Sequence, residues 1–535
     1  MQTPDLHHLE FILLFLMVLV VALASLARRF RTPYPIVLVI GGLAVSFLPN
    51  LPQVSLNPDV IFLVLLPPLL FTAAFHTSWR DIRMNLPVIL LLAFGLVGFT
   101  AAALAYMSGW LLPGFDHRLG FVLGALVAST DAIAASAIAR RVGLPKRIID
   151  VLEGESLVND ATALVALEFS VATLVSNQVP TIGAGVLRLI YLTVAGVLIG
   201  LVAARLIRWG QSRLTDAPIE VTLILIAPYL SYFAAESVHA SGVLATVACG
   251  LYLGHKRSQS LSMRARLESA GVLNTLDFAL NGLVFALIGL QLPHILAGIR
   301  DLRLATLLLD GVLVAALLIA LRMIWVFVES WISHAIRKLF KRPAPPVPAR
   351  EQFIVGWTGM RGVIALAAAV SLPETLDNGM PFPQRDVLIF LTFCVILFTL
   401  VAQGLSLPFL IRKLGLAATP ASIGEEHDTR QKMLMAAVNQ IHALRNQGDA
   451  ADDEMLADLL HHYQQRLEET NQTSEGDGPV LPEYEQYRNL SGRLRATERS
   501  TLLRLRDENK INDEVLRTLE QELDLLDTHN RSTHA

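Results

Sequence analysis

The sequence predicts an all-α polytopic membrane protein that ends in a helical domain of different composition. Of its 535 residues, 53% are hydrophobic and only 17% are charged, and the mean hydropathy is +0.52. Soluble domains are about 45–50% apolar and about 25% charged. The excess apolar surface therefore indicates lipid as the solvent for most of the chain.

The distribution of charge divides the chain in two. Up to Lys413 the sequence has 30 Lys and Arg against 23 Asp and Glu, whereas the remainder has 13 against 23. We therefore expect a transmembrane domain at 1–415 and a helical cytoplasmic domain at 416–535. Within the second domain, the segments that favour amphipathic or charged helices are 426–447, 451–470, 484–511 and 513–528.

The first domain contains about thirteen stretches that meet the requirement of about 20 mostly apolar residues for a membrane span. The predicted spans are 9–27, 33–50, 58–75, 86–109, 117–139, 149–175, 182–205, 219–238, 241–255, 272–292, 304–336, 350–372 and 384–413. Little more than His239 and Gly242 separates the eighth span from the ninth. The N-terminal residues lack the features of a cleaved signal peptide, so we expect the first helix to be retained.

Basic residues predict the orientation of these spans. Loops after odd-numbered spans carry most of the Lys and Arg, whereas the opposite loops carry only Arg118, Arg300, Arg303 and Arg385. Cytoplasmic loops hold the Lys and Arg excess. We therefore expect a multi-pass protein of the plasma or inner membrane with its N-terminus outside and its C-terminal tail in the cytoplasm.

An odd number of spans suits two six-helix inverted repeats joined by one helix. The fifth and twelfth spans would then correspond. The fifth carries Ser129-Thr130-Asp131, and the twelfth carries the glycine-rich run Gly356–Gly362. Polar and glycine-rich interruptions at matching places in two repeats predict discontinuous, crossing helices at a transport site.

Several polar groups lie at the depth where a charge costs at least about 2.5–3.5 kcal/mol. They are Asp131 in the fifth span, Glu155, Asn159 and Asp160 in the sixth, and Arg361 in the twelfth. Because three helices bring polar groups to one depth, we interpret them as a single functional site.

Helical geometry suggests the role of each group. Ser156 and Asp160 are four residues apart and share a face, where a hydroxyl and a carboxylate suit a hard cation. Glu155 points elsewhere and needs a counter-charge, for which Arg361 is the expected partner in a structural ion bridge. Asp160 has no obvious permanent partner, so either a proton or a cation can neutralise it. That competition would couple sodium in one direction to protons in the other. Asp131 either accepts helix-end N–H groups or orients a bound water.

Other intramembrane groups are more often structural. We expect Glu168 to pair with Arg188, and His76 and His239 to lie at the membrane interface. Arg322, Glu236 and Asp277 would line the pathway or neutralise a helix end. Cys249 and Cys394 match no metal or redox spacing, and nothing predicts a cofactor, a catalytic residue or a nucleic-acid partner.

At these residues the sequence resembles the bacterial NhaP-type and animal NHE-type sodium/proton exchangers, within the monovalent cation:proton antiporters. The resemblance runs from about Phe62 to Leu410. It rests on five motifs in order, which are Leu65–Phe71, Ser129–Ala132, Gly154–Asp160, His239–Ala245 and Gly359–Gly362.

The resemblance implies that Asp160 is the shared ion and proton carboxylate. It implies Ser156 and Thr130 as ligands of the transported cation, with Asp131 beside them, and Glu155 with Arg361 as the ion bridge. Asn159 occupies the place of a second Asp in electrogenic relatives, so one cation per proton, an electroneutral exchange, is expected. Homodimers, an elevator-like movement and a role in pH homeostasis are also implied.

Two positions depart from the pattern of the resemblance. Members often have an acid where this chain has Thr72, and animal members have Glu where it has Asn281. Both differences reduce negative charge near the expected ion path, so they leave open whether sodium, potassium or lithium is preferred.

Three alternatives remain beside sodium/proton exchange. Potassium/proton exchange would use the same chemistry. An intramembrane aspartyl enzyme would need Asp131 and Asp160 as a catalytic pair, but the sequence has no Gly-x-Gly-Asp, Ser/His or His-Glu-x-x-His pattern. A passive channel would need a selectivity filter, and nothing resembles one.

Overall fold

The computed structural model describes residues 6–30, 32–48, 58–175, 182–214, 216–300, 302–339, 347–376, 379–416, 421–445 and 453–472, with isolated residues between 494 and 519. The chain divides into two compact units, Met1–Thr419 and Pro420–Ala535. Helices form nearly all the regular structure of the described residues, which otherwise contain one isolated β-bridge between Thr375 and Pro381.

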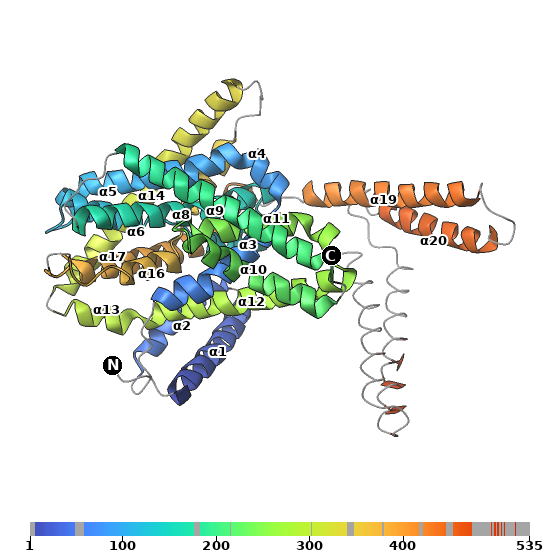
Figure 1. Cartoon of the computed structure of the whole chain (residues 1–535), viewed down its shortest axis with the longest axis horizontal. Coiled ribbons are helices and arrows are strands. Elements are labelled where there is room, and N and C mark those ends of the chain that lie inside the picture. Colours follow the sequence, from blue (N-terminus) through green and yellow to red (C-terminus); the bar gives the residue numbers. More distant parts are fainter. Residues whose placement is uncertain are drawn as a thin grey trace. The chain divides into compact units, whose positions relative to one another are not determined.

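The helices of the first unit lie side by side in one bundle (Figure 1). They are α1 (Leu6–Arg29), α2 (Tyr34–Ser46), α3 (Leu66–His76), α4 (Trp79–Leu90), α5 (Val97–Leu111), α6 (His117–Leu126), α7 (Ala132–Val142), α8 (Lys146–Val175), α9 (Ile182–Gln211), α10 (Ala217–Glu236), α11 (Gly242–Ser260), α12 (Met263–Leu290), α13 (Leu292–Gly298), α14 (Leu304–Leu339), α15 (Ala349–Trp357), α16 (Val363–Val370), α17 (Arg385–Phe398) and α18 (Gly404–Lys413). Three π-helical segments, η1 (Val60–Leu65), η2 (Leu91–Leu96) and η3 (Thr399–Gln403), continue into α3, α5 and α18.

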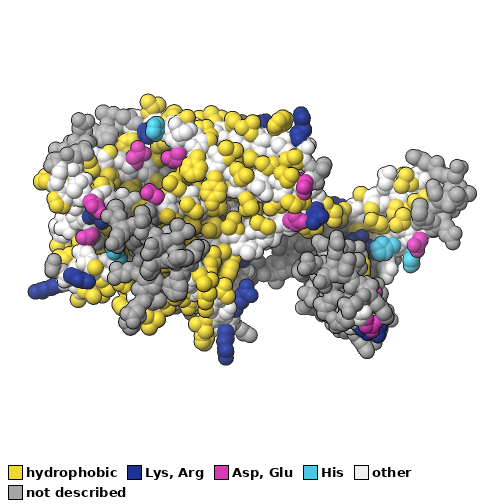
Figure 2. Space-filling model, turned by 60° about the horizontal axis from the view of Figure 1, so that its bottom comes forward, with side chains coloured by type: hydrophobic (Ala, Val, Ile, Leu, Met, Phe, Trp, Pro, Cys, Tyr) yellow, Lys and Arg dark blue, Asp and Glu magenta, His cyan; other side chains and the backbone are white. Residues whose placement is uncertain are grey.

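Length and hydropathy mark seven helical stretches of the described residues as able to cross a membrane. They are Trp79–Leu111, Lys146–Val175, Gly185–Gln211, Ala217–Glu236, Met263–Gly298, Leu304–Ala335 and Arg385–Lys413. Figure 2 shows hydrophobic side chains spread across the described part of one face of the bundle. On α9, for example, the exposed side chains include Leu187, Leu198 and Leu206. The first unit is therefore a multi-pass membrane protein. Every predicted span overlaps a helix, but the number of crossings stays a prediction.

The boundary between the eighth and ninth predicted spans is a tight turn. α10 ends at Glu236 and α11 begins at Gly242, with His239 in the left-handed region at φ 54°. The Ser241 hydroxyl accepts a hydrogen bond from the backbone N–H of Leu244 at 3.2 Å, which caps α11. The sequence places this turn correctly, although α11 extends further, to Ser260.

Two helices are interrupted where the sequence predicts discontinuity. The chain is not helical at 127–131, between α6 and α7, nor at 358–362, between α15 and α16. The two breaks lie against each other, because the backbone N–H of Asp131 donates to the carbonyl of Met360 at 2.8 Å. Backbone N–H and C=O groups outside a helix are tolerated at membrane depth only where protein or a water-filled cavity provides hydrogen-bond partners. Here the first break provides a donor, the N–H of Asp131, and the second provides an acceptor, the carbonyl of Met360.

The helices of the first unit fall into two groups. In one group, α12 packs on α2, and α11 packs on α3, α9 and α10. In the other, α6 packs on α5 and α8, and α14 packs on α17 and α15. Fewer residues join the groups, mainly where α8 meets α11 and α3 and where α16 meets α12. The breaks belong to the second group.

The second unit contains α19 (Ala421–Arg445) and α20 (Asp453–Gln472), which pack on each other. Their apolar contact includes the buried side chains of Leu434, Ile441 and Leu460. These helices overlap the predicted segments 426–447 and 451–470. The predicted helices 484–511 and 513–528 lie almost wholly outside the described residues.

Candidate functional site

A cavity of about 430 Å³ lies between the two helix groups, at the crossing of the two breaks. The first group lines it with polar side chains that include Tyr34, Thr72, His76, Asn274, Asp277 and Asn281. The second group lines it with Ser129, Thr130, Asp131, Ser156, Asp160 and Gly362. At its rim Arg140 of α7 and Glu153 of α8 form an ion pair of 2.8 Å, with the Arg140 side chain 64% exposed. The cavity thus leads from a charged rim to buried carboxylates.

Asp160 is a buried carboxylate without a positively charged partner among the described residues. Its side chain is 4% exposed, and Oδ1 accepts a hydrogen bond from the hydroxyl of Ser129. A carboxylate buried beside a neutral donor lacks the counter-charge that would offset its desolvation. A cation or a proton that enters the cavity can supply that charge.

Ser156 holds the backbone of the first break. Its hydroxyl donates to the carbonyl of Thr130 at 2.9 Å and accepts from the backbone N–H of Ala132 at 3.3 Å. Ser156 and Asp160 both line the cavity, as their spacing on one face of α8 predicts. The serine therefore connects the carboxylate-bearing helix to the break that crosses it.

Asp131 caps α7 and anchors the crossing. Its Oδ1 accepts from the backbone N–H of Ile133 at 2.8 Å, an N-cap contact that satisfies a helix-end donor. Of the two roles that the sequence left open for Asp131, the structure shows this one. A Cβ on Gly362 would lie 2.6 Å from the Cβ of Asp131, so the close approach of the breaks requires glycine at 362.

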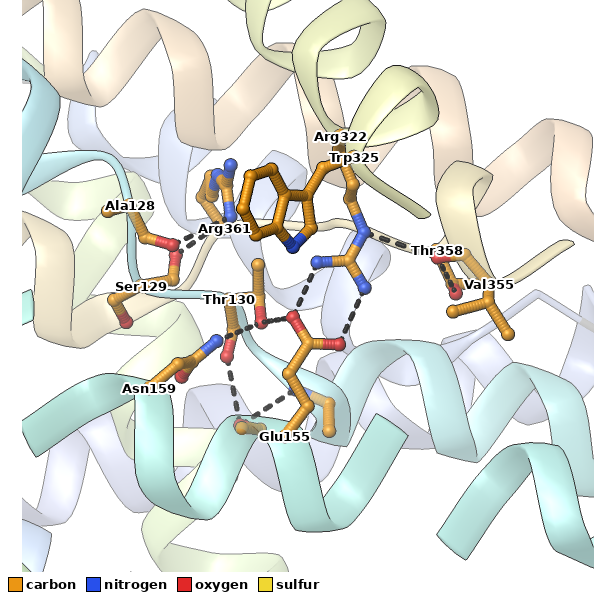
Figure 3. Close-up of polar contacts among 12 residues, drawn as sticks. Ala128, Ser129, Thr130, Glu155, Asn159, Arg322, Trp325, Val355, Thr358 and Arg361 are labelled. Carbon is orange, nitrogen blue, oxygen red and sulfur yellow. Dashed lines mark hydrogen bonds and ion pairs between the residues drawn. The ribbon is translucent and has the colours of Figure 1, made fainter. Parts of the chain in front are cut away.

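Thr130, which lines the cavity, connects two side chains of α8 (Figure 3). Its hydroxyl donates to Oε1 of Glu155 at 3.2 Å and accepts from Nδ2 of Asn159. Asn159 is 1% exposed and does not line the cavity, and its Oδ1 has no partner among the described residues. Asn159 thus lies one contact away from the cavity and orients Thr130.

The expected ion bridge between Glu155 and Arg361 is wrong. Glu155 pairs instead with Arg322 of α14, whose Nη1 and Nη2 donate to the two carboxylate oxygens at 2.5 and 2.7 Å. Glu155 does point away from Asp160, as predicted, but the helix that faces it there is α14. Arg322 also donates through Nε to the carbonyl of Val355 at 3.2 Å, which leaves its planar guanidinium well matched to both partners.

Arg361 satisfies backbone rather than a carboxylate. Its Nη1 donates to the carbonyls of Ala128 and Ser129 at 3.1 and 3.3 Å, and its backbone N–H donates to the Thr399 hydroxyl at 3.2 Å. The side chain is 1% exposed. The guanidinium of Arg361 therefore donates to carbonyls that have no helical partner after the end of α6 (Figure 3). It extends to them from the second break, between α15 and α16.

Of the remaining predicted groups, Asp277 and Asn281 lie together on the other wall. Nδ2 of Asn281 donates to Oδ1 of Asp277 at 2.9 Å. Thr72 lines the same cavity, and its hydroxyl has no partner among the described residues. Glu168 pairs with Arg188 at 3.4 Å, as predicted, with both side chains partly exposed.

Two functional residues were missed. Ser129 bonds Asp160, although it was noted only as part of a motif, and no spacing rule links residues 31 positions apart. Arg322 offered a clearer signal, because a second arginine in the middle of an apolar span needs a carboxylate partner. The sequence left its role open, and the structure assigns it to Glu155.

Comparison with known proteins identifies the family. The sequence pattern of the family described as "Sodium/hydrogen exchanger, transmembrane" matches residues 15–413. A protein of Mycobacterium tuberculosis, named an uncharacterized Na(+)/H(+) exchanger, is 32% identical over 533 residues and covers 96% of each chain. The Na(+)/H(+) antiporter ApNhaP of Aphanothece halophytica is 34% identical over 413 residues, which are 74% of this chain and 73% of that protein.

Two further comparisons extend the likeness. The Bacillus subtilis protein named sodium, potassium, lithium and rubidium/H(+) antiporter is 31% identical over 415 residues, 75% of this chain and 61% of its own. The structure of the sodium proton antiporter MjNhaP1 from Methanocaldococcus jannaschii has a TM-score of 0.61 at 19% identity, over 76% of this chain and 98% of that one, so it shares the fold. With its crossed breaks, buried carboxylates and matched sequence, the chain belongs to the family of transmembrane sodium/hydrogen exchangers.

Proposed function

We propose that this protein is a secondary active transporter that exchanges sodium for protons, with Asp160 as the group for which the two ions compete. The observation that carries the proposal is the environment of Asp160, a buried carboxylate at a cavity whose one described partner is a neutral hydroxyl. A metal cation and a proton cannot both neutralise it at once. Their competition couples the two fluxes when the site faces each side of the membrane in turn.

In this proposal the cation is held by oxygen atoms around the first break. Asp160 supplies a carboxylate, and Ser156 and Thr130 line the same part of the cavity. Hard monovalent and divalent cations prefer such oxygen ligands. Asp131, already fixed as the cap of α7, contributes negative charge beside them.

The proposed stoichiometry is one cation per proton. Asn159 is a neutral amide that does not line the cavity, and its Nδ2 donates to the hydroxyl of Thr130. Glu155 is neutralised by Arg322, so it adds no second exchangeable site. One carboxylate that alternates between a proton and a cation gives electroneutral exchange.

The proposed transport cycle uses the two helix groups as separate bodies. The rim of the cavity lies beside Arg140 and Glu153, on the side that the distribution of Lys and Arg predicts to be cytoplasmic. Movement of the breaks against α2, α3 and α12 would expose Asp160 to the other side. We further propose inverted six-helix repeats, homodimers in the plasma or inner membrane, and a cytoplasmic second unit.

A liposome assay tests the function. Purified protein is reconstituted with a pH-sensitive dye trapped inside, and external sodium is added. Exchange predicts alkalinisation of the lumen by the wild type and none by Asp160→Asn, with Glu168→Gln, a surface carboxylate of the same helix, as the matched control. Normal exchange by Asp160→Asn would exclude the mechanism, and titration with potassium and lithium measures which cation is preferred.

A further inference from the structure

The wall of the cavity opposite Asp160 carries a carboxylate that the exchange mechanism does not use. Asp277 lies on α12, and the amide of Asn281, one turn further along, donates to its Oδ1 at 2.9 Å. The amide fixes the orientation of the carboxylate while its second oxygen remains available to the cavity. Asp277 and Asp160 therefore belong to different helix groups on either side of one space.

A second polar atom points to a ligand at the same wall. The Thr72 side chain is 3% exposed and lines the cavity, yet its hydroxyl has no partner among the described residues. Buried hydroxyls are almost always hydrogen-bonded. The backbone carbonyl of Thr72 already accepts a hydrogen bond from Nδ1 of His76 at 2.8 Å, whereas the hydroxyl of the same residue is left for a ligand.

The charges around this wall favour a cation. His76 donates through Nδ1 to a carbonyl, and Tyr34 contributes a ring that packs on Phe278 at 6.0 Å between centroids. Among the described residues that line the cavity, the arginine is Arg140, and it is already paired with Glu153 at the rim. Asp277 shares this wall with His76 but forms no ion pair among the described residues. A carboxylate of this kind in a narrow cleft raises the local concentration of cations.

We propose that Asp277, oriented by Asn281 and assisted by the Thr72 hydroxyl, forms a second site for a monovalent cation in this cavity. A partly hydrated cation occupies it before transfer to Asp160 on the opposite wall. The proposal rests on the proposed function, because it names a step that precedes binding at Asp160. In the proposed cycle, the site on α12 stays in place, whereas the site at Asp160 of α8 moves with the breaks.

A binding measurement tests the second site without transport. The thermal unfolding midpoint of purified protein is measured in sodium and in matched choline chloride, because a ligand that binds the folded state raises that midpoint. We expect Asp160→Asn to keep part of the sodium-dependent shift and the double variant Asp160→Asn/Asp277→Asn to lose it. The Glu168→Gln variant controls for loss of a carboxylate elsewhere. A shift that is equal in the single and double variants overturns the proposal.

A kinetic measurement separates this proposal from the proposed function. In the liposome assay we expect Asp277→Asn to raise the apparent KM for sodium about three- to tenfold with kcat little changed, and Asp277→Glu to restore most of the affinity. An unchanged KM with intact wild-type exchange overturns the second site alone. Absence of exchange in the wild type overturns the proposed function, while the thermal measurement still reports on cation binding.

Discussion

Glu155 and Arg322 form a bidentate ion pair between α8 and α14, with both side chains at most 2% exposed. The pair neutralises one of the two acids of α8 that lie at the crossing, Glu155 and Asp160, before any ion arrives. Gly359 contributes to it, because a Cβ there would lie 2.8 Å from Nε of Arg322. The glycine-rich break thus makes room for the arginine, and Glu155 is neutralised while Asp160 has no positively charged partner among the described residues.

Breaking this pair should destabilise the protein strongly. Glu155→Gln leaves the buried Arg322 without a counter-charge, which costs about 3–5 kcal/mol. The double variant Glu155→Gln/Arg322→Met removes both charges and should recover part of that loss. Thermal unfolding in detergent compares the wild type, Glu155→Gln, Arg322→Met and the double variant. A double variant less stable than both single variants would contradict the pairing.

Thr130 should matter through its hydroxyl. Thr130→Val keeps the shape but leaves the Asn159 amide without its partner, at a cost of about 1–3 kcal/mol, and it frees the break to shift. We expect exchange to fall about tenfold, the rate equivalent of 1.4 kcal/mol, and Thr130→Ser to restore most of it. Liposome exchange rates decide this, and wild-type rates in Thr130→Val would rule out the role.

Gly362→Ala should separate the two breaks. Its Cβ would lie 2.6 Å from the Cβ and 2.8 Å from Oδ2 of Asp131, and neither the N-cap nor the backbone can yield freely. We expect loss of exchange with a folded protein, measured by transport and by size-exclusion chromatography. Gly98→Ala is the matched control, because a Cβ there meets nothing within 4 Å. Equal activity of the two variants would show that the close approach is dispensable.

Membrane voltage should not alter the exchange rate. At the crossing the described residues include the cations Arg322 and Arg361 and the carboxylates Glu155, Asp131 and Asp160. With Asp160 bound to either a proton or a sodium ion, these charges balance. Liposomes clamped at about ±100 mV with valinomycin should exchange at equal rates, whereas one uncompensated charge would be worth about 2.3 kcal/mol per 100 mV. A voltage-dependent rate would contradict the 1:1 stoichiometry.

The second unit should be dispensable for the exchange reaction itself. Every residue that lines the cavity lies within Met1–Thr419. A chain that ends at Thr419 is expected to retain sodium-dependent alkalinisation of liposomes. Loss of exchange by a folded, monodisperse truncated protein would show that Pro420–Ala535 takes part in transport rather than in its regulation.

The sequence predicted the features that follow from the spacing of apolar residues and from the cost of burying polar groups in lipid. Apolar stretches gave the helices, and the polar residues of the fifth and twelfth spans gave both breaks, because their location follows from the cost of placing such groups in lipid. The spacing of Ser156 and Asp160 gave their common face. These features are local, so one stretch of sequence contains enough information to predict them.

Contacts between side chains of different helices were not predictable in the same way. From the sequence, Arg361 was expected as the partner of Glu155 and Arg322 in another role, and only tertiary packing decides that α14 presents Arg322 to Glu155. Arg361 instead reaches the carbonyls of Ala128 and Ser129, which exist as acceptors only because α6 ends there. The role of Ser129 was not predictable because its hydroxyl reaches Asp160 of α8 from the break between α6 and α7.

The hydrogen bond from Asp131 to Met360, together with the contacts of Arg361, has a consequence for binding kinetics. The non-helical backbone at the crossing is already fixed by protein groups, so a bound ion has little chain to order. Preorganisation of this kind removes the entropic cost of forming a site. The association rate of the cation should therefore be set by the loss of its hydration water, and it should respond to ion size more than to protein flexibility.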